Sequence, residues 1–209
     1  MITKICGIKN KDTLICCENN NVDFFGMIFY PKSPRNISIE NASILQNTSK
    51  DLKINGVGVF VNKNINELED IIKNIKLRFV QLHGSEDNTY IKNVKKIGVK
   101  IIKSVSLSKS DDLNKTAKYS GADYYLFDYK PHNGELPGGN AKSFDWNILK
   151  NQKIDKPWFL SGGINTNNVQ QIIDDINPFG VDLSSGVEKE LGIKDNHTIN
   201  NFIGKLKNA

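Results

Sequence analysis

The chain has 209 residues, of which 38% are hydrophobic, and its formal net charge is +5. This length allows one domain with a large core, and no lysine or arginine cluster is dense enough to indicate nucleic-acid binding. The three cysteines lack the spacing of a disulfide framework, which favours free thiols in a reducing compartment. The sequence shows neither a signal peptide nor an apolar run long enough to span a bilayer, so we expect a cytoplasmic protein that does not enter membranes.

Short apolar segments alternate with amphipathic segments along the chain. Strands are predicted at 2–6, 23–30, 56–61, 79–84, 99–105 and 123–128, and the continuous apolar runs are typical of a parallel sheet buried on both faces. Helices are predicted at 12–18, 39–48, 65–75, 90–97, 113–119 and 198–206, with another beginning at 144–149. Ser38 is expected to cap the second of these helices.

The stretch 157–188 contains a further strand–helix–strand unit. Two short apolar strands each end in a turn of small residues, and the helical run 165–175 lies between them. The backbone N–H groups of such turns can close around an anion at a helix N-terminus. Paired turns of this kind suggest the phosphate site that follows strands 7 and 8 of a (β/α)8 barrel, and they comprise Gly162, Gly163, Ser184, Ser185 and Gly186.

Eight strand–helix units without a linker predict an α/β protein in which residues 1–209 form a single-domain (β/α)8 TIM barrel. A doubly wound open sheet is the alternative, although neither G-x-G-x-x-G nor a Walker A motif is present. The longest connection, 129–142, is rich in glycine and proline, and we interpret it as a lid.

In a barrel the chemistry lies at the carboxyl ends of the strands. No spacing there indicates a metal site, and no Ser-His-Asp arrangement is suggested. The residues at these ends are Cys6, Tyr30 with the loop to Arg35, Asn62, His83, Ser104–Ser106, Asp128, Ser161–Gly163 and Ser184–Gly186.

An ordered set of motifs resembles one enzyme family over the whole length of the chain. The motifs are Lys4-Ile5-Cys6-Gly7-Ile8, Phe29 to Arg35, Gln81-Leu82-His83-Gly84, Leu126-Phe127-Asp128, Phe144-Asp145-Trp146, Leu160 to Gly163 and Val181 to Glu188. The family is phosphoribosylanthranilate isomerase of tryptophan biosynthesis. The resemblance implies an Amadori rearrangement of N-(5-phosphoribosyl)anthranilate that needs no cofactor and no metal.

The resemblance also implies residue roles. Asp128 would be the general acid, Cys6 the general base and Arg35 the residue that holds the anthranilate carboxylate. A thiol acts as a base only when ionised, so we expect a positive field that makes Cys6 partly thiolate. His83 is given no step and is interpreted as structural or as a support for a residue that contacts the substrate. Asp182 is interpreted as structural because it is placed at the start of the last strand.

The chain departs from the family pattern in two segments. Asn140-Ala141 stand where Thr/Ser-Gly is usual, which concerns the lid, and Leu191 stands where proline is common. Another phosphosugar isomerase or epimerase, or a catalytically silent phosphate-binding barrel, are the competing interpretations. We expect a monomer that binds a small phosphosugar, and weak association with neighbouring pathway enzymes is left open.

Overall fold

A computed structural model of the protein describes residues 1–132, 134–135, 138–139 and 142–208. The predicted lid at 129–142 is therefore described in part, and the expectation about Asn140 and Ala141 lies outside the described residues. No helix among the residues described is long and apolar enough to cross a membrane.

Eight parallel strands form a closed barrel in which each strand pairs with the next along the chain. They are β1 (Ile2–Cys6), β2 (Phe24–Ile28), β3 (Asn55–Phe60), β4 (Phe79–Leu82), β5 (Lys100–Leu107), β6 (Tyr124–Tyr129), β7 (Trp158–Leu160) and β8 (Gly180–Leu183). The barrel closes where β1 pairs with β8, with Ile2 opposite Gly180 and Ile5 opposite Leu183. This closure confirms the predicted barrel and excludes the open sheet.

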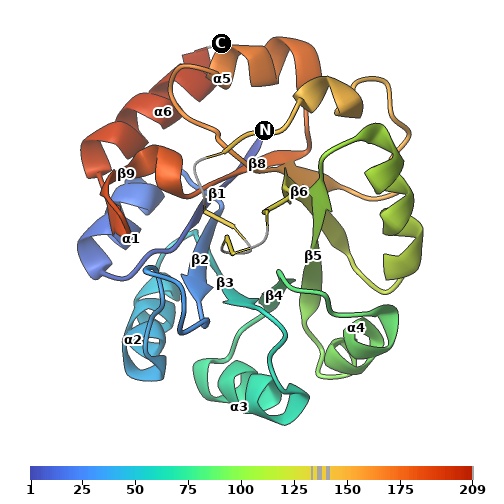
Figure 1. The fold of residues 1–209 in the computed structure, drawn as a ribbon. Helices are drawn as coiled ribbons and strands as arrows, with labels where there is room; N and C mark the ends of the chain where they lie inside the picture. Colours follow the sequence, from blue (N-terminus) through green and yellow to red (C-terminus); the bar gives the residue numbers. More distant parts are fainter. Residues whose placement is uncertain (133, 136–137, 140–141, 209) are drawn as a thin grey trace.

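Helices surround the barrel, as Figure 1 shows. The α-helices are α1 (Lys11–Asn19), α2 (Ile39–Ser49), α3 (Ile65–Ile75), α4 (Asn88–Lys95), α5 (Val169–Gln171) and α6 (Asn196–Asn208). The others are the 3₁₀ helices η1 (Ser110–Tyr119), η2 (Trp146–Leu149) and η4 (Ser185–Val187) and the π-helix η3 (Ile172–Ile176). As predicted, the Ser38 hydroxyl caps α2 by accepting a hydrogen bond from the N–H of Asn41 at 3.2 Å.

Two predicted helices differ from the observed ones because polar side chains reshape their first turns. The predicted 113–119 helix is η1, where the Asp112 carboxylate accepts hydrogen bonds from the N–H groups of Ser108 and Lys109 at 2.9 and 3.2 Å. The run predicted from 165 becomes helical only at Val169, because Asn165 and Asn168 donate their side-chain hydrogen bonds to the carbonyl of Gly163, each at 2.9 Å. The sequence predicts a helix that begins beside Gly163, but in the structure the chain there is a turn and the helix begins at Val169.

A short antiparallel hairpin, absent from the sequence-based prediction, follows β8. It consists of β9 (Glu188–Glu190) and β10 (Ile193–Lys194), with Lys194 opposite Glu188. Its turn contains Gly192 at φ +80°, a backbone angle that favours glycine. The hairpin lies beside the barrel mouth and contributes to the site described below.

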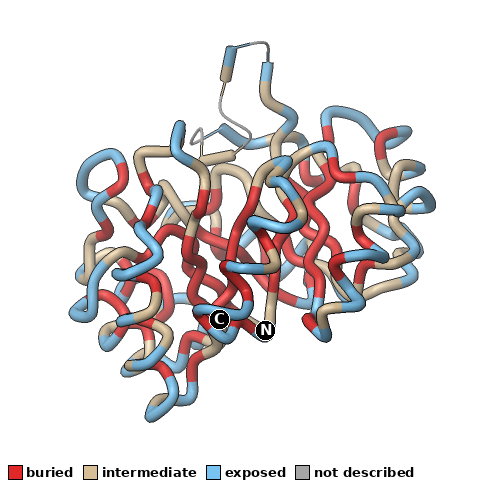
Figure 2. Tube along the Cα trace, turned by 90° about the horizontal axis from the view of Figure 1, so that it is seen from below, coloured by how far each residue is buried: buried red, intermediate tan, exposed pale blue. Residues whose placement is uncertain are grey.

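The inside of the barrel is apolar at one end and polar at the other. Val57, Ile102, Leu126 and Phe159 form a buried cluster, against which Phe24 packs among other apolar side chains. In Figure 2 both termini lie at one end of the barrel, and the described parts of the connection between β6 and η2 stand above the opposite end. That opposite end contains the carboxyl ends of the strands, where active sites lie in proteins of this fold.

Candidate active site

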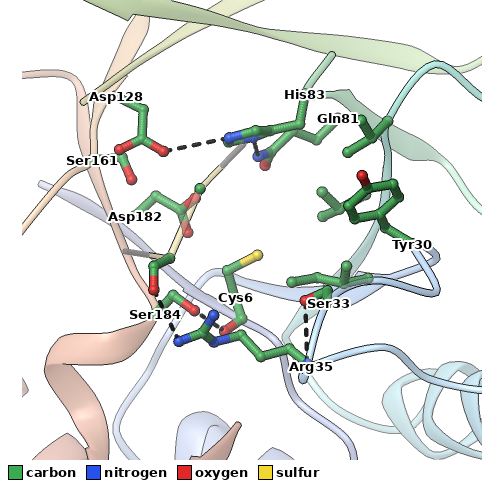
Figure 3. A pocket seen from close by; sticks show the side chains of 15 residues that line it. Cys6, Tyr30, Ser33, Arg35, Gln81, His83, Asp128, Ser161, Asp182 and Ser184 are labelled. Atoms are coloured by element: carbon green, nitrogen blue, oxygen red, sulfur yellow. Dashed lines mark hydrogen bonds and ion pairs between the residues drawn. The ribbon is translucent and has the colours of Figure 1, made fainter. Parts of the chain in front are cut away.

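One cavity of about 530 Å³ lies inside the barrel mouth (Figure 3). Because side chains alternate along a strand, Cys6 at the end of β1 and Asp128 near the end of β6 both face it. Its lining comprises Cys6, Ile28, Tyr30, Ser33, Arg35, Val59, Val61, Gln81, His83, Asp128, Gly138, Gly139, Ser161, Asp182 and Ser184. The structure thus brings together the three side chains to which the sequence analysis gave roles in the chemistry.

Cys6 is nearly enclosed, with 6% of its surface exposed. Burial raises the pKa of its thiol, although the ammonium groups of Lys4 and Lys194 act in the opposite direction. Burial therefore opposes the partly ionised thiol that the sequence analysis expects. The positive field is present, but the loss of hydration outweighs it.

A buried ion pair lies beneath the thiol. The Lys4 ammonium donates hydrogen bonds to both carboxylate oxygens of Asp182 at 2.9 Å, and neither residue is more than 5% exposed. Burial alone would lower the pKa of Lys4, but the attraction of Asp182 raises it above its usual value. The placement of Asp182 at the start of its strand is wrong: it is the third of four residues in β8, and it lines the cavity. The same alternation that marks Cys6 could have identified Lys4, two residues earlier on the same face.

Asp128 is held from two sides. Its Oδ1 accepts a hydrogen bond from the N–H of Tyr129 at 2.8 Å, and its Oδ2 lies 3.4 Å from Nε2 of His83. The side-chain amide of Gln81 holds the imidazole from the other side, with its Nε2 2.7 Å from Nδ1 of His83. His83 is thus a direct neighbour of the expected acid, and it lines the cavity from the strand end where the sequence analysis places it.

Arg35 reaches the cavity from the loop after β2, but it is not a free cation. Only 2% of it is exposed, and its Nε and Nη2 donate to the two carboxylate oxygens of Glu188 at 2.7 and 2.8 Å. Nη2 also donates to the carbonyl of Gly139 at 3.3 Å. Burial raises the pKa of Glu188, but its hydrogen bonds and charge contacts with Arg35 and Lys194 outweigh burial and bring it down to about 2. The sequence analysis quoted Glu188 within a motif yet gave it no role.

The glycine and serine turns line an adjoining cavity of about 370 Å³. Gly162 and Gly163 have φ angles of +86° and +71°, which favour glycine. Among the described residues, no group accepts a hydrogen bond from the N–H groups of Gly162, Gly163, Ser185 or Gly186. These donors suit an anion. Lys142 also lines the cavity, and its ammonium group is paired with Glu135.

Gly186 has a different position from the other turn residues. It does not line either cavity, and a Cβ atom built on it would lie 1.9 Å from the carbonyl oxygen of Ile164. Glycine is therefore required here to let the turn after β8 pack against the turn after β7. Because Gly186 lacks a side chain, the two turns can approach closely, and in this way Gly186 supports the proposed anion site without lining it.

The two cavities share a wall and differ in character. They share Asp128, Gly138, Gly139, Ser161, Asp182 and Ser184. Ile28, Val59, Val61 and Tyr30 line only the first, which gives that cavity an apolar character near Arg35. The described part of the predicted lid lies against both cavities: Cβ atoms built on Gly138 and Gly139 would lie 2.7 Å from Nε2 of His83 and 2.3 Å from Nη1 of Arg35.

Within the described part of the chain, no group of three His, Cys, Asp or Glu side chains is arranged to hold a metal ion. Cys6, Asp128 and Asp182 line the same cavity, and their thiol and carboxylates face its interior (Figure 3).

Comparisons with known proteins agree on one family. A family model described as N-(5′-phosphoribosyl)anthranilate (PRA) isomerase matches residues 3–205. The N-(5′-phosphoribosyl)anthranilate isomerase of Paramagnetospirillum magneticum is 37% identical over 203 residues, which cover 96% of this chain and 94% of that protein. The crystal structure of phosphoribosyl anthranilate isomerase from Thermotoga maritima has a TM-score of 0.90 at 34% identity, and 100% of both chains is covered. A structure of such an isomerase in complex with reduced 1-(o-carboxyphenylamino)-1-deoxyribulose 5-phosphate has a TM-score of 0.86 at 32% identity, again covering 100% of both chains.

Proposed function

Because the chain belongs to the N-(5′-phosphoribosyl)anthranilate isomerase family, we propose that its cavity performs the family's rearrangement with Cys6 and Asp128 as the acid–base pair. The protein is an enzyme of L-tryptophan biosynthesis, an aldose–ketose isomerase. It converts N-(5-phosphoribosyl)anthranilate into 1-(2-carboxyphenylamino)-1-deoxyribulose 5-phosphate. Neither a cofactor nor a metal is part of the proposed mechanism.

The observation that supports the residue assignment is that one cavity is apolar beside Arg35, while the adjoining cavity is lined by glycine and serine turns. The substrate has an aromatic ring with a carboxylate at one end, a phosphate at the other and a ribose between them. The apolar end beside Arg35 suits the aromatic acid, and the end with the Gly162–Gly163 and Ser184–Gly186 turns suits the phosphate. The ribose would then lie between Cys6 and Asp128, where the bonds change.

The proposed reaction begins with proton transfer from the Asp128 carboxyl group to the furanose oxygen. The bond from that oxygen to C1′ breaks, and the lone pair of the anthranilate nitrogen forms a C1′=N bond. The Cys6 thiolate then removes the proton from C2′, and that electron pair forms C1′=C2′ while the nitrogen recovers its lone pair. The product ketone forms when C1′ gains a proton and the C2′ hydroxyl loses one. The proton left on Cys6 then returns through solvent to Asp128, so substrate and enzyme both end with the protons they need for the next turnover.

This mechanism assigns a task to the buried lysines. Because burial raises the pKa of the Cys6 thiol, the thiolate needs a compensating positive charge when it acts. Lys4 and Lys194 supply that charge from two different elements, β1 and β10. A substrate that seals the cavity would strengthen these interactions by excluding water.

One assay tests the function. Freshly made phosphoribosylanthranilate is fluorescent through its anthranilate group, and its loss is followed after the protein is added. We expect the parent protein to consume phosphoribosylanthranilate catalytically, and Asp128→Asn to consume it at least about a hundredfold more slowly. If the parent is folded by circular dichroism but the substrate fluorescence disappears no faster than in buffer, the protein would instead be a catalytically silent phosphate-binding barrel.

We further propose that residues 1–209 form one domain that acts as a monomer in the cytoplasm. The large apolar core that includes residues from all eight barrel strands supports one domain, and the three free cysteines suit a reducing compartment. Sedimentation velocity at micromolar concentration tests the monomer. The same experiment with neighbouring pathway enzymes added tests weak association.

A further inference from the structure

A three-membered ionic cluster joins the loop after β2 to the hairpin after β8. Glu188 accepts hydrogen bonds from Nε and Nη2 of Arg35 at 2.7 and 2.8 Å, and its Oε1 also accepts from the Lys194 ammonium at 2.7 Å. The three side chains are buried, with at most 5% of each exposed. Such a dense set of charges away from water is costly unless every member is paired.

The hairpin holds Glu188 in place through its own pairing. Lys194 stands opposite Glu188 in the β9–β10 register and also donates to the carbonyl of Ser184 at 2.9 Å. The N–H of Gly192 donates to Oε2 of Glu188 at 3.2 Å. At the turn, a Cβ atom on Gly192 would lie 2.6 Å from the carbonyl oxygen of Pro34, so the hairpin packs directly against the residue before Arg35.

The pairing leaves one side of the Arg35 guanidinium for another partner. Glu188 takes Nε and one hydrogen of Nη2, and the other Nη2 hydrogen is donated to the carbonyl of Gly139. Nη1 is left for another partner, and it lies beside Gly139, which lines the cavity. The guanidinium is planar, so a carboxylate that grips one edge also fixes the direction of the other donors. The bidentate pair therefore sets the direction in which Arg35 can receive an anion.

The cluster also sets the local charge. Arg35 and Lys194 are cations and Glu188 is an anion, so the cluster carries one net positive charge, which lies between the apolar end of the cavity and the Cys6 thiol that Lys194 also influences. One carboxylate neutralises that charge, whereas a group with two negative charges would leave an excess. This balance suits a monoanionic aromatic acid at that end, with the dianionic phosphate directed to the turns after β7 and β8.

We propose that Glu188, held by Lys194, is a positioning residue that aims Arg35 at the substrate carboxylate and matches that end of the cavity to one negative charge. The proposal rests on the proposed role of Arg35. It gives the β9–β10 hairpin a function, since the hairpin brings Glu188 and Lys194 to a guanidinium that belongs to a loop 153 positions away from Glu188.

The test is steady-state kinetics of Glu188→Gln, which keeps the size of the side chain but removes its charge. We expect KM to rise about tenfold with kcat within about twofold, the pattern of lost substrate binding. Inhibition by free anthranilate should weaken by a similar factor, while inhibition by inorganic phosphate should not change. Glu190→Gln, on the exposed part of the same hairpin, is the matched control and should match the parent in every measurement.

A double-mutant cycle separates the inference from the function on which it depends. If Glu188 acts through Arg35, adding Glu188→Gln to Arg35→Met should raise KM little beyond the value for Arg35→Met alone. An unchanged KM in Glu188→Gln beside a raised KM in Arg35→Met would overturn the inference but leave the role of Arg35 intact. An unchanged KM in Arg35→Met would instead remove the proposed role of Arg35.

A second variant keeps the test decisive if Glu188→Gln does not fold. Glu188→Asp retains the negative charge but is shorter by one methylene group, so the guanidinium must turn to keep its pair. We expect this variant to fold and to raise KM several-fold, again with unchanged inhibition by phosphate. A parental KM, or an equal loss of anthranilate and phosphate inhibition, would overturn the inference.

Discussion

Gly26 stands opposite Cys6 in the parallel pairing of β1 and β2, and a Cβ atom built on Gly26 would lie 2.7 Å from the thiol sulfur. The same atom would lie 3.1 Å from the Cα of Cys6. Real Cβ atoms do not approach a neighbour this closely, so the thiol keeps its place only while position 26 is glycine. The sequence-based interpretation named Cys6 but gave Gly26 no role.

Gly26→Ala is therefore expected to displace the thiol. Because misplacing a reacting group by about 1 Å can cost up to about a hundredfold in rate, we expect kcat to fall about tenfold or more. Gly204→Ala is the control, since no described atom lies within 4 Å of a Cβ atom at that helical position. The control should keep parental kcat and gain up to about 1 kcal/mol of helix stability. Parental kcat in Gly26→Ala would show that the thiol position is not critical.

Gly163→Val tests the phosphate end of the cavity. A Cβ atom there would lie 2.8 Å from the Cβ of Ser143, and the φ angle of +71° disfavours any side chain. We expect KM to rise about tenfold, which corresponds to about 1.4 kcal/mol of binding, and inhibition by inorganic phosphate to weaken in parallel.

Gly98→Val is the matched control for that substitution. Gly98 lies in the turn between α4 and β5 with a similar φ angle of +93°, and apart from its chain neighbours no described atom lies within 4 Å of its Cβ position. It reproduces the backbone strain without the close approach. If both variants raised KM equally, strain alone would explain the effect, and the turn after β7 would not be the phosphate site.

The sequence was sufficient for the barrel because parallel strands buried on both faces leave continuous apolar runs, and each such run became a strand. It also located Cys6, Asp128 and Arg35 at strand ends or in the loops that follow them. Contacts between distant positions could not be predicted from the sequence. Lys4 and Asp182 are 178 positions apart, and nothing in either segment identifies the other as its partner. The helix expected from 165 failed for a different reason, since asparagine side chains compete with the backbone for hydrogen bonds.

Acid stability should reveal the charge on Glu188. Its pKa falls from 4.5 to about 2 in the folded protein, so the ionised form stabilises the fold above the unfolded value, and this contribution is lost as the pH falls from about 4.5 toward 2. The free energy of unfolding of the parent minus that of Glu188→Gln should therefore be largest at neutral pH and shrink across that window. Urea unfolding at pH 7, 5, 4 and 3 measures the difference.

The exposed Glu190 again provides the comparison. The difference between the parent and Glu190→Gln should stay nearly constant over the same pH range, because that side chain is solvated. A constant difference for Glu188→Gln as well would contradict the view that Arg35 and Lys194 hold Glu188 ionised.

The central claim is that Cys6 and Asp128 carry the protons, and the most direct test is kcat for Cys6→Ser and Asp128→Asn in the fluorescence assay. Both substitutions are close in size to the original side chains, so stability should change little. We expect each to lower kcat at least about a hundredfold, the low end for acid–base catalysis, with KM nearly unchanged. Parental kcat in both variants would contradict the mechanism, and parental kcat in Cys6→Ala would reject the thiol as the base.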